Sequence, residues 1–228
     1  MTTLSPEKLA TRTRINAIAL VPAPILVGIV LVAITGRFEL LPFLLGGAGW
    51  MIALVLRQPV ALIATRAVGQ ERAATIVGWC SGPAEELVRF GLVVLILGNF
   101  QGALWAGFGW AAVEVLLVAI NVFAIATLMT RDDPKSREAR EILAAQGMMT
   151  PHHPLWGFLE RLSAIALHLG FTLMIFASPW LVLVTLPLHS VVNMTAVRFS
   201  KSHVAITELG LAVTGAAVLT AGLLLNLG

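Results

Sequence analysis

Two glutamates and an arginine stand inside a stretch that is otherwise typical of a membrane-spanning helix. Glu85, Glu86 and Arg89 lie within an apolar run from about 73 to 97. On a helix Glu85 and Arg89 are one turn apart and share a face, and Glu86 is also within reach of Arg89. An ionisable side chain at the centre of a bilayer costs at least about 2.5–3.5 kcal/mol, so three in one helix indicate a functional site.

Four further polar side chains fall at similar depths in three other apolar runs, when each is placed by the helical rise of about 1.5 Å per residue. They are Glu114 in 102–129, His168 in 156–177, and His189 and Asn193 in 180–197. Polar residues with separate structural roles would be scattered in depth. The shared depth therefore predicts that the helices bring these side chains into one site.

The residue types indicate hydrolysis of an acyl bond, above all a peptide bond. A carboxylate in a site of low dielectric constant can act as general base towards water. Arg89 can hold one of the two glutamates ionised while the other works, and His168 can share the water or bind a metal. His189 and Asn193, four residues apart, present donors on one helical face, which suits stabilisation of an oxyanion.

The composition predicts a membrane protein. The chain has 228 residues, of which 58% are hydrophobic and 12% charged, whereas soluble domains carry about 25% charged residues. The basic residues that raise the pI to about 9.8 recur in short joints between apolar runs, so the sequence does not indicate a nucleic-acid partner. The single cysteine, Cys80, excludes an intrachain disulfide.

We expect an all-α, polytopic transmembrane bundle of about seven spans, forming a single domain over 1–228. The predicted spans are 15–35, 40–56, 73–97, 102–129, 156–177, 180–197 and 204–227. Arg57 closes the second span, and 59–70, which Arg66 interrupts, is expected to be an interfacial helix. The polar joint 131–154 is expected to hold a short helix over 136–145.

The basic residues predict the orientation of the bundle. With a cytoplasmic N-terminus, twelve Lys and Arg fall in inner joints and only Arg37 falls in an outer one. The first apolar run is too long for a signal-peptide core and is expected to be retained. We therefore expect a multi-pass protein of the cell membrane, with the lipid bilayer around it.

The order of the polar motifs resembles the CAAX-protease and bacteriocin-processing (abortive-infection) superfamily of intramembrane proteases, in particular its PrsW and YhfC branches. The motifs are Glu85-Glu86-x-x-Arg89, Gly107-Phe108-Gly109-Trp110 leading to Glu114, Glu160-Arg161 followed by His168, and His189-x-x-x-Asn193. The resemblance covers about 82–193, within a motif-bearing core of about 72–199.

The resemblance implies a role for each residue. Glu85, with Glu86 as the alternative, would activate water, and Arg89 would orient that carboxylate. Glu114, His168 and His189 would line the site, and Asn193 would complete the oxyanion pocket with His189. No cofactor is expected; the alternative is a zinc ion held by Glu85, His168 and His189. Trp110 stands where YhfC-like members tend to have His, which removes one potential metal ligand.

The sequence thus predicts an intramembrane endopeptidase that acts on a membrane-anchored protein or peptide. Two alternatives use the same polar cluster: a proton-coupled carrier and a catalytically silent scaffold. The individual groups also have structural alternatives. Glu114, His168, His189 and Asn193 can be interhelical hydrogen bonders, and Glu160 with Arg161 can be an interfacial pair or a gate.

Overall fold

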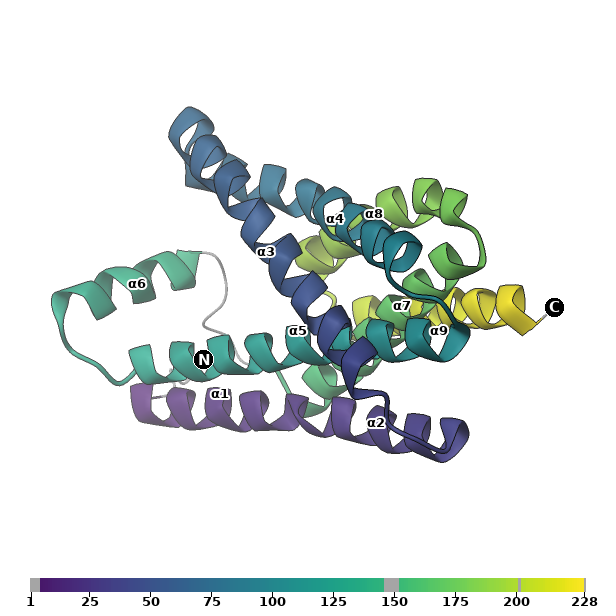
Figure 1. Ribbon diagram of the computed structural model, residues 1–228. Helices are drawn as coiled ribbons and strands as arrows, with labels where there is room; N and C mark the ends of the chain where they lie inside the picture. Colours follow the sequence, from purple (N-terminus) through teal and green to yellow (C-terminus); the bar gives the residue numbers. More distant parts are fainter. Residues whose placement is uncertain (1–4, 146–151, 201, 228) are drawn as a thin grey trace.

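The computed structural model describes residues 5–145, 152–200 and 202–227, and these residues form helices and contain no strand (Figure 1). The helices are α1 Pro6–Leu20, α2 Pro22–Thr35, α3 Leu40–Val68, α4 Gln70–Leu95, α5 Phe100–Leu128, α6 Pro134–Ala145, α7 Pro154–Ala177, α8 Val182–Phe199 and α9 Val204–Leu227, with a 3₁₀ turn, η1, at Pro179–Leu181. The expected all-α bundle is confirmed.

Six described segments are long and apolar enough to cross a membrane, which is the architecture of a multi-pass membrane protein. They are α1 joined to α2, α3, α5, α7, η1 joined to α8, and α9. The seventh expected span is α4, whose 26 residues extend about 39 Å at the helical rise. Glu85, Glu86 and Arg89 distinguish α4 from the six, because they give it three ionisable side chains within its apolar part.

The predicted end of the second span at Arg57 is wrong. The helix α3 continues through Pro59 to Val68, so most of the segment 59–70 belongs to α3 and does not form the expected interfacial helix. A proline inside a helix removes only the bond to the carbonyl four residues earlier, and neighbouring helices let membrane helices tolerate that loss. Arg57 therefore stands inside a long helix, where it can reach a neighbouring helix.

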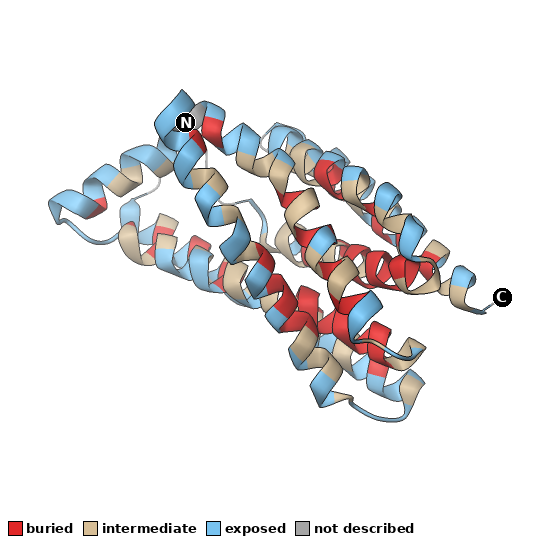
Figure 2. Cartoon of the chain, turned by 45° about the horizontal axis from the view of Figure 1, so that its top comes forward, coloured by how far each residue is buried: buried red, intermediate tan, exposed pale blue. Residues whose placement is uncertain are grey.

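The central helix of the bundle is α7. In its most apolar stretch 67% of the residues are buried, against 17–28% in the five other membrane-capable segments, and Figure 2 shows buried residues concentrated along it. The helix packs on α9 and α5, while α4 packs between α3 and α8 (Figure 1). The polar residues of α4, α5 and α8 are therefore directed towards α7.

Glycines allow the helices around this centre to approach closely. A Cβ at Gly46 of α3 would overlap the Ala106 carbonyl of α5, and a Cβ at Gly109 of α5 would overlap the Phe43 carbonyl. On α9, a Cβ at Gly222 would lie 2.8 Å from the Gly170 carbonyl oxygen of α7. Any larger side chain at these positions would push the helices apart.

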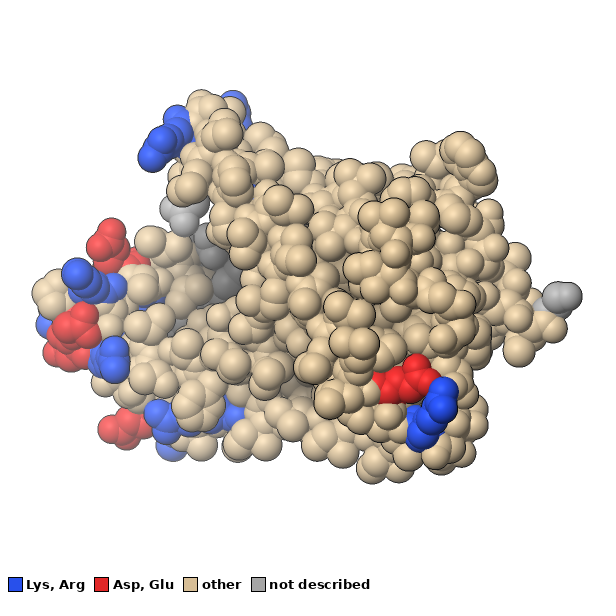
Figure 3. Space-filling view, in the orientation of Figure 1, with Lys and Arg blue, Asp and Glu red and all other residues tan. Residues whose placement is uncertain are grey.

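Charged residues lie towards the ends of the molecule on the face that Figure 3 shows. They gather around α6 and at the corner between α3 and α4, and one acid–base pair lies at the opposite end, over the joint between α2 and α3. That joint carries the Arg37–Glu39 ion pair, 2.7 Å long. The expected short helix in the polar joint is confirmed as α6, and the following residues 146–151 lie outside the described ones.

Candidate active site

Three residues of α4 and α8 explain why these helices lie against each other at the site. Gly82 has no side chain, and a Cβ there would overlap the Ser190 hydroxyl of α8. Pro83 has no N–H, which leaves the Trp79 carbonyl without its helical donor. The Ser190 hydroxyl donates to that carbonyl at 2.9 Å. This cross-helix bond brings His189 beside Glu86.

Arg89 and Glu86 form an enclosed ion pair behind the site. Both side chains are 0% exposed, and the Arg89 Nε donates to Glu86 Oε1 at 3.1 Å. The same carboxylate oxygen lies 2.7 Å from Nδ1 of His189. Arg89 also donates from Nη1 to Thr172 Oγ1 at 2.8 Å, and its Cζ lies 4.2 Å from the centre of the Trp110 ring. Each charge is thus compensated where water does not reach.

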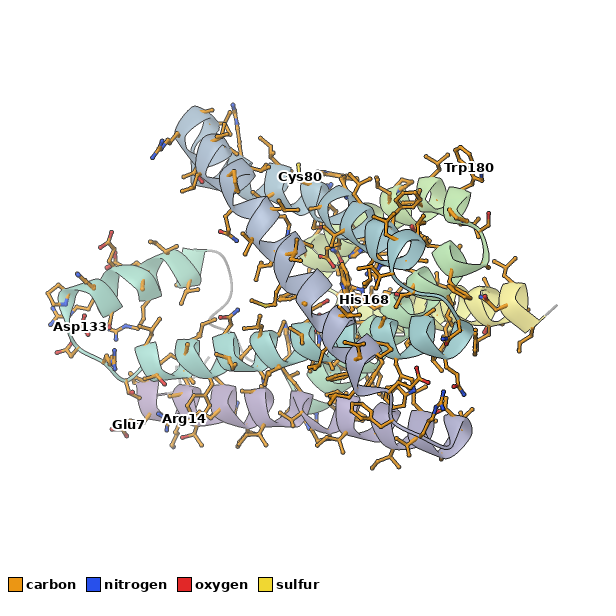
Figure 4. All side chains as sticks on the ribbon, in the orientation of Figure 1. Glu7, Arg14, Cys80, Asp133, His168 and Trp180 are labelled. Atoms are coloured by element: carbon orange, nitrogen blue, oxygen red, sulfur yellow. The ribbon has the colours of Figure 1, made fainter. Side chains whose placement is uncertain are left out.

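Arg89 determines the tautomer of His168. Its Nη2 lies 2.9 Å from Nδ1 of His168, and because a guanidinium only donates, Nδ1 must accept. The proton of the neutral ring is then on Nε2, which lies 2.6 Å from Oε2 of Glu114 and donates to it. His168 is therefore a neutral bridge between the enclosed ion pair and Glu114, and Figure 4 shows it in the interior of the bundle.

Glu85 has a different environment from its neighbour Glu86. Arg57 of α3 lies 3.3 Å from Oε1, and Nε1 of Trp110 donates to Oε2 at 3.2 Å. Oε2 is also 3.8 Å from Nε2 of His189. The carboxylate lines a cavity of about 310 Å³, the site cavity, whereas Glu86 and Arg89 do not. Glu85 is the glutamate that can act on a bound molecule.

His189 and Asn193 reach the site cavity from α8. Nδ1 of His189 donates to the Glu86 carboxylate, so its Nε2 is directed towards Glu85. In the neutral ring this Nε2 carries no hydrogen and can only accept a hydrogen bond. Only the protonated ring presents a second donor there. Asn193 uses one amide hydrogen on the Ser81 hydroxyl at 3.0 Å, which leaves the other for a ligand. Both side chains line the site cavity.

Glu114 joins the site cavity to a second ion-pair group. Its Oε1 lies 3.1 Å from Nη1 of Arg161, and the other guanidinium nitrogen, Nη2, pairs with Glu160. Arg161 is buried, with 8% of its side chain exposed. Of the two residues of the predicted interfacial pair, Glu160 is partly exposed, whereas Arg161 is buried.

One group of carboxylates and imidazoles has the spacing of a metal site. Ligand atoms of Glu85, Glu114 and His168 all lie within 4.8 Å of one another; the sequence had suggested His189 in place of Glu114. To bind a metal through Nε2, His168 would have to move its proton to Nδ1, which faces the donors of Arg89. These residues fit a metal only if Arg89 moves.

All seven residues singled out in the sequence meet at this site. Five of them line the site cavity, namely Glu85, Glu114, His168, His189 and Asn193. The spacing allowed Arg89 to hold either glutamate; in the structure Arg89 pairs with Glu86 and not with Glu85, since its contacts with α7 draw it to that side. Arg57 takes its place on Glu85.

Three contacts of the site were missed from the sequence: Arg57, Trp110 and Thr172. Arg57 was counted among the joint charges, although the apolar run continues beyond it. Trp110 was noted only as a departure from a family pattern, and its indole N–H proves to be a donor to Glu85. Nothing in the sequence marks Thr172, which follows His168 by one helical turn.

Comparison with known proteins gives no relative: no family model, no curated protein and no solved structure matches this chain.

Proposed function

We propose that this chain is an intramembrane endopeptidase in which Glu85 activates water to hydrolyse a peptide bond. The observation that carries the proposal is the contrast on α4: Glu86 is neutralised behind the site, while Glu85 lines the site cavity. Arg57 and the indole of Trp110 hold that carboxylate. A fixed carboxylate facing a cavity inside a membrane-capable bundle is what a general base towards water requires.

The reaction follows from the positions of these groups. Glu85 takes a proton from water as the water oxygen bonds to the carbonyl carbon of the substrate. The free amide hydrogen of Asn193, and Nε2–H of His189 when that ring is protonated, donate to the developing oxyanion. The carbon–nitrogen bond then breaks, and the proton on Glu85 passes to the leaving amine. The products are a carboxylic acid and an amine.

The substrate is a membrane-anchored protein or peptide, because the site cavity lies among helices that are long and apolar enough to span a bilayer. The order of motifs along α4, α5, α7 and α8, which resembles that of the CAAX-protease and bacteriocin-processing superfamily, supports the same reaction. A proton-coupled carrier would use the same groups without breaking a bond.

Mapping of membrane-protein N-termini tests the proposal. Cells carry the wild-type chain, Glu85→Gln or Glu141→Gln at equal abundance. Glu141 lies exposed on α6 and is the matched control for loss of a carboxylate. We expect new N-termini with the wild type and with Glu141→Gln, and a reduction of about 10²–10⁴-fold with Glu85→Gln, because the general base is lost while the shape is kept.

Identical N-terminal profiles from all three strains would exclude proteolysis and favour the carrier or the scaffold. A folded Glu85→Gln protein is required for the comparison, and its thermal unfolding in detergent provides that check.

A further inference from the structure

A second cavity lies next to the site cavity and has no role in the proposed reaction. It has a volume of about 340 Å³ and lies between α1, α5 and the start of α7, the end of α8 and the start of α9. Val118, Glu160 and Ala196 line both cavities, so the two are contiguous. The lining of the second cavity includes the start of α7, the end of α8 and the start of α9, and the positive-inside rule predicts that these helix ends lie on the cytoplasmic side.

The second cavity contains a buried acid. Glu208 of α9 is 5% exposed and lines the cavity. Its Oε2 is buried and receives no hydrogen bond from the described residues. An unpaired carboxylate at such a place is costly, so a cationic ligand would be strongly favoured there.

The charges around the second cavity are not balanced among the described residues. Glu160 and Glu208 line it together with His152 and His153, and no described Lys or Arg does. The adjacent Arg161 already binds Glu160 and Glu114 with its two terminal nitrogens. Glu208 therefore has no ion-pair partner among the described residues, whereas Glu85 and Glu86 have an arginine each.

The walls of the cavity suit a long basic side chain. Leu20, Val122, Val197 and the indole of Trp156 offer apolar surface on which the methylenes of Lys or Arg can pack while the charged end reaches the carboxylates. Membrane-spanning segments carry their Lys and Arg mainly on the cytoplasmic flank, and the helix ends around the second cavity are predicted to lie on that side.

We propose that the second cavity binds a Lys or Arg side chain on the cytoplasmic flank of a membrane-anchored substrate, with Glu208 and Glu160 as its counter-charges. The inference rests on the proposed function for its substrate, but the binding itself does not depend on catalysis. Because the two cavities are contiguous, the basic residue lies on the cytoplasmic side of the bond that Glu85 attacks. Glu208 is then a specificity-determining residue.

Binding of synthetic peptides to the full chain in lipid nanodiscs tests this proposal. One peptide has about twenty apolar residues followed by two lysines, and the other has two glutamines in their place. The protein carries Glu85→Gln so that no cleavage occurs. We expect the lysine peptide to bind at least tenfold more tightly, and Glu208→Gln to reduce the difference to less than twofold.

Glu141→Gln is the control for general attraction between a basic peptide and an acidic surface, and it should keep the tenfold preference. Equal binding of the two peptides to the Glu85→Gln protein would overturn the proposal, even if Glu208→Gln failed to fold. A preference that survives Glu208→Gln would also overturn it, and would assign Glu208 to a structural role or a water path. Because no cleavage is measured, these outcomes are independent of the N-terminal mapping.

Discussion

The two neighbouring glutamates of α4 have opposite surroundings. Glu86 is enclosed, and one of its oxygens is bound by both Arg89 and His189. Glu85, one residue earlier, faces the site cavity and is held from α3 and α5 by Arg57 and Trp110. A rotation of about 100° on the helix therefore separates a carboxylate that joins helices from one that can react.

Identical side chains in one motif therefore need not share a role. An enclosed ion pair is costly to break, because the remaining charge stays buried. Glu85 is also buried, with 4% of its side chain exposed, but it borders the site cavity and keeps the Trp110 donor when Arg57 is lost. Changes on the two sides of α4 should consequently affect different properties, namely stability on the Glu86 side and catalysis on the Glu85 side.

The largest effect should come from replacing the two arginines separately by methionine. Arg89→Met leaves Glu86 buried and without its cation, so we expect a loss of about 3–5 kcal/mol in the free energy of unfolding. Arg57→Met should cost about 1–2 kcal/mol, because Glu85 keeps the Trp110 donor and faces the cavity. Unfolding in mixed detergent micelles measures both values.

The two substitutions should also differ in activity. Arg57→Met should lower the turnover of the folded protein, since it alters the carboxylate that faces the cavity. Equal losses of stability in the two variants would contradict the division of α4 into an enclosed and a cavity-facing side.

A smaller effect is expected at the contact between α3 and α5, which brings Arg57 and Trp110 to Glu85. Gly109→Ala would place a methyl group on the Phe43 carbonyl and force α3 outwards, at a cost of about 1–3 kcal/mol. The enclosed ion pair has no hydrogen bond to either helix, and only the Trp110 ring of α5 packs on it, so activity should fall more than stability alone predicts. Thermal unfolding and N-terminal mapping measure the two effects.

Gly91→Ala is the matched control, because nothing lies within 4 Å of a Cβ at that position of α4. It should be neutral or stabilise by up to about 1 kcal/mol through helix propensity. A destabilisation by Gly91→Ala as large as that by Gly109→Ala would show that close approach of α3 and α5 is not the cause.

The smallest effect should follow loss of the indole donor to Glu85. Trp110→Phe keeps an aromatic ring over Arg89 but removes the hydrogen bond to Oε2, so we expect roughly a tenfold loss of activity, equivalent to about 1.4 kcal/mol. The same substitution at Trp105 of α5 is the control, since that buried indole N–H has no partner among the described residues. Equal activities of Trp110→Phe and Trp105→Phe would exclude a role for the donor.

Much of the architecture and the membership of the site could be predicted from the sequence. Apolar runs of spanning length predict helices because a bilayer requires every backbone polar group to be bonded within the chain. The shared depth of Glu114, His168, His189 and Asn193 predicted that they meet. The exception was the boundary after Arg57, where a basic residue and a nearby proline imitate the end of a span.

The types and depths of the polar residues were enough to predict seven members of the site, because burying an ionisable group in an apolar bundle requires partners at the same depth. Arg57, Trp110 and Thr172 were not among them. The tertiary structure alone decided which partner each glutamate has. Arg89 is within helical reach of both Glu85 and Glu86, and local spacing cannot distinguish them. Thr172 and His168 of α7 bind Arg89 on the side of Glu86. Because α3 continues as one helix past Pro59, Arg57 lies within the bundle and reaches Glu85. Local sequence patterns could not predict these contacts, because they join residues far apart in the chain.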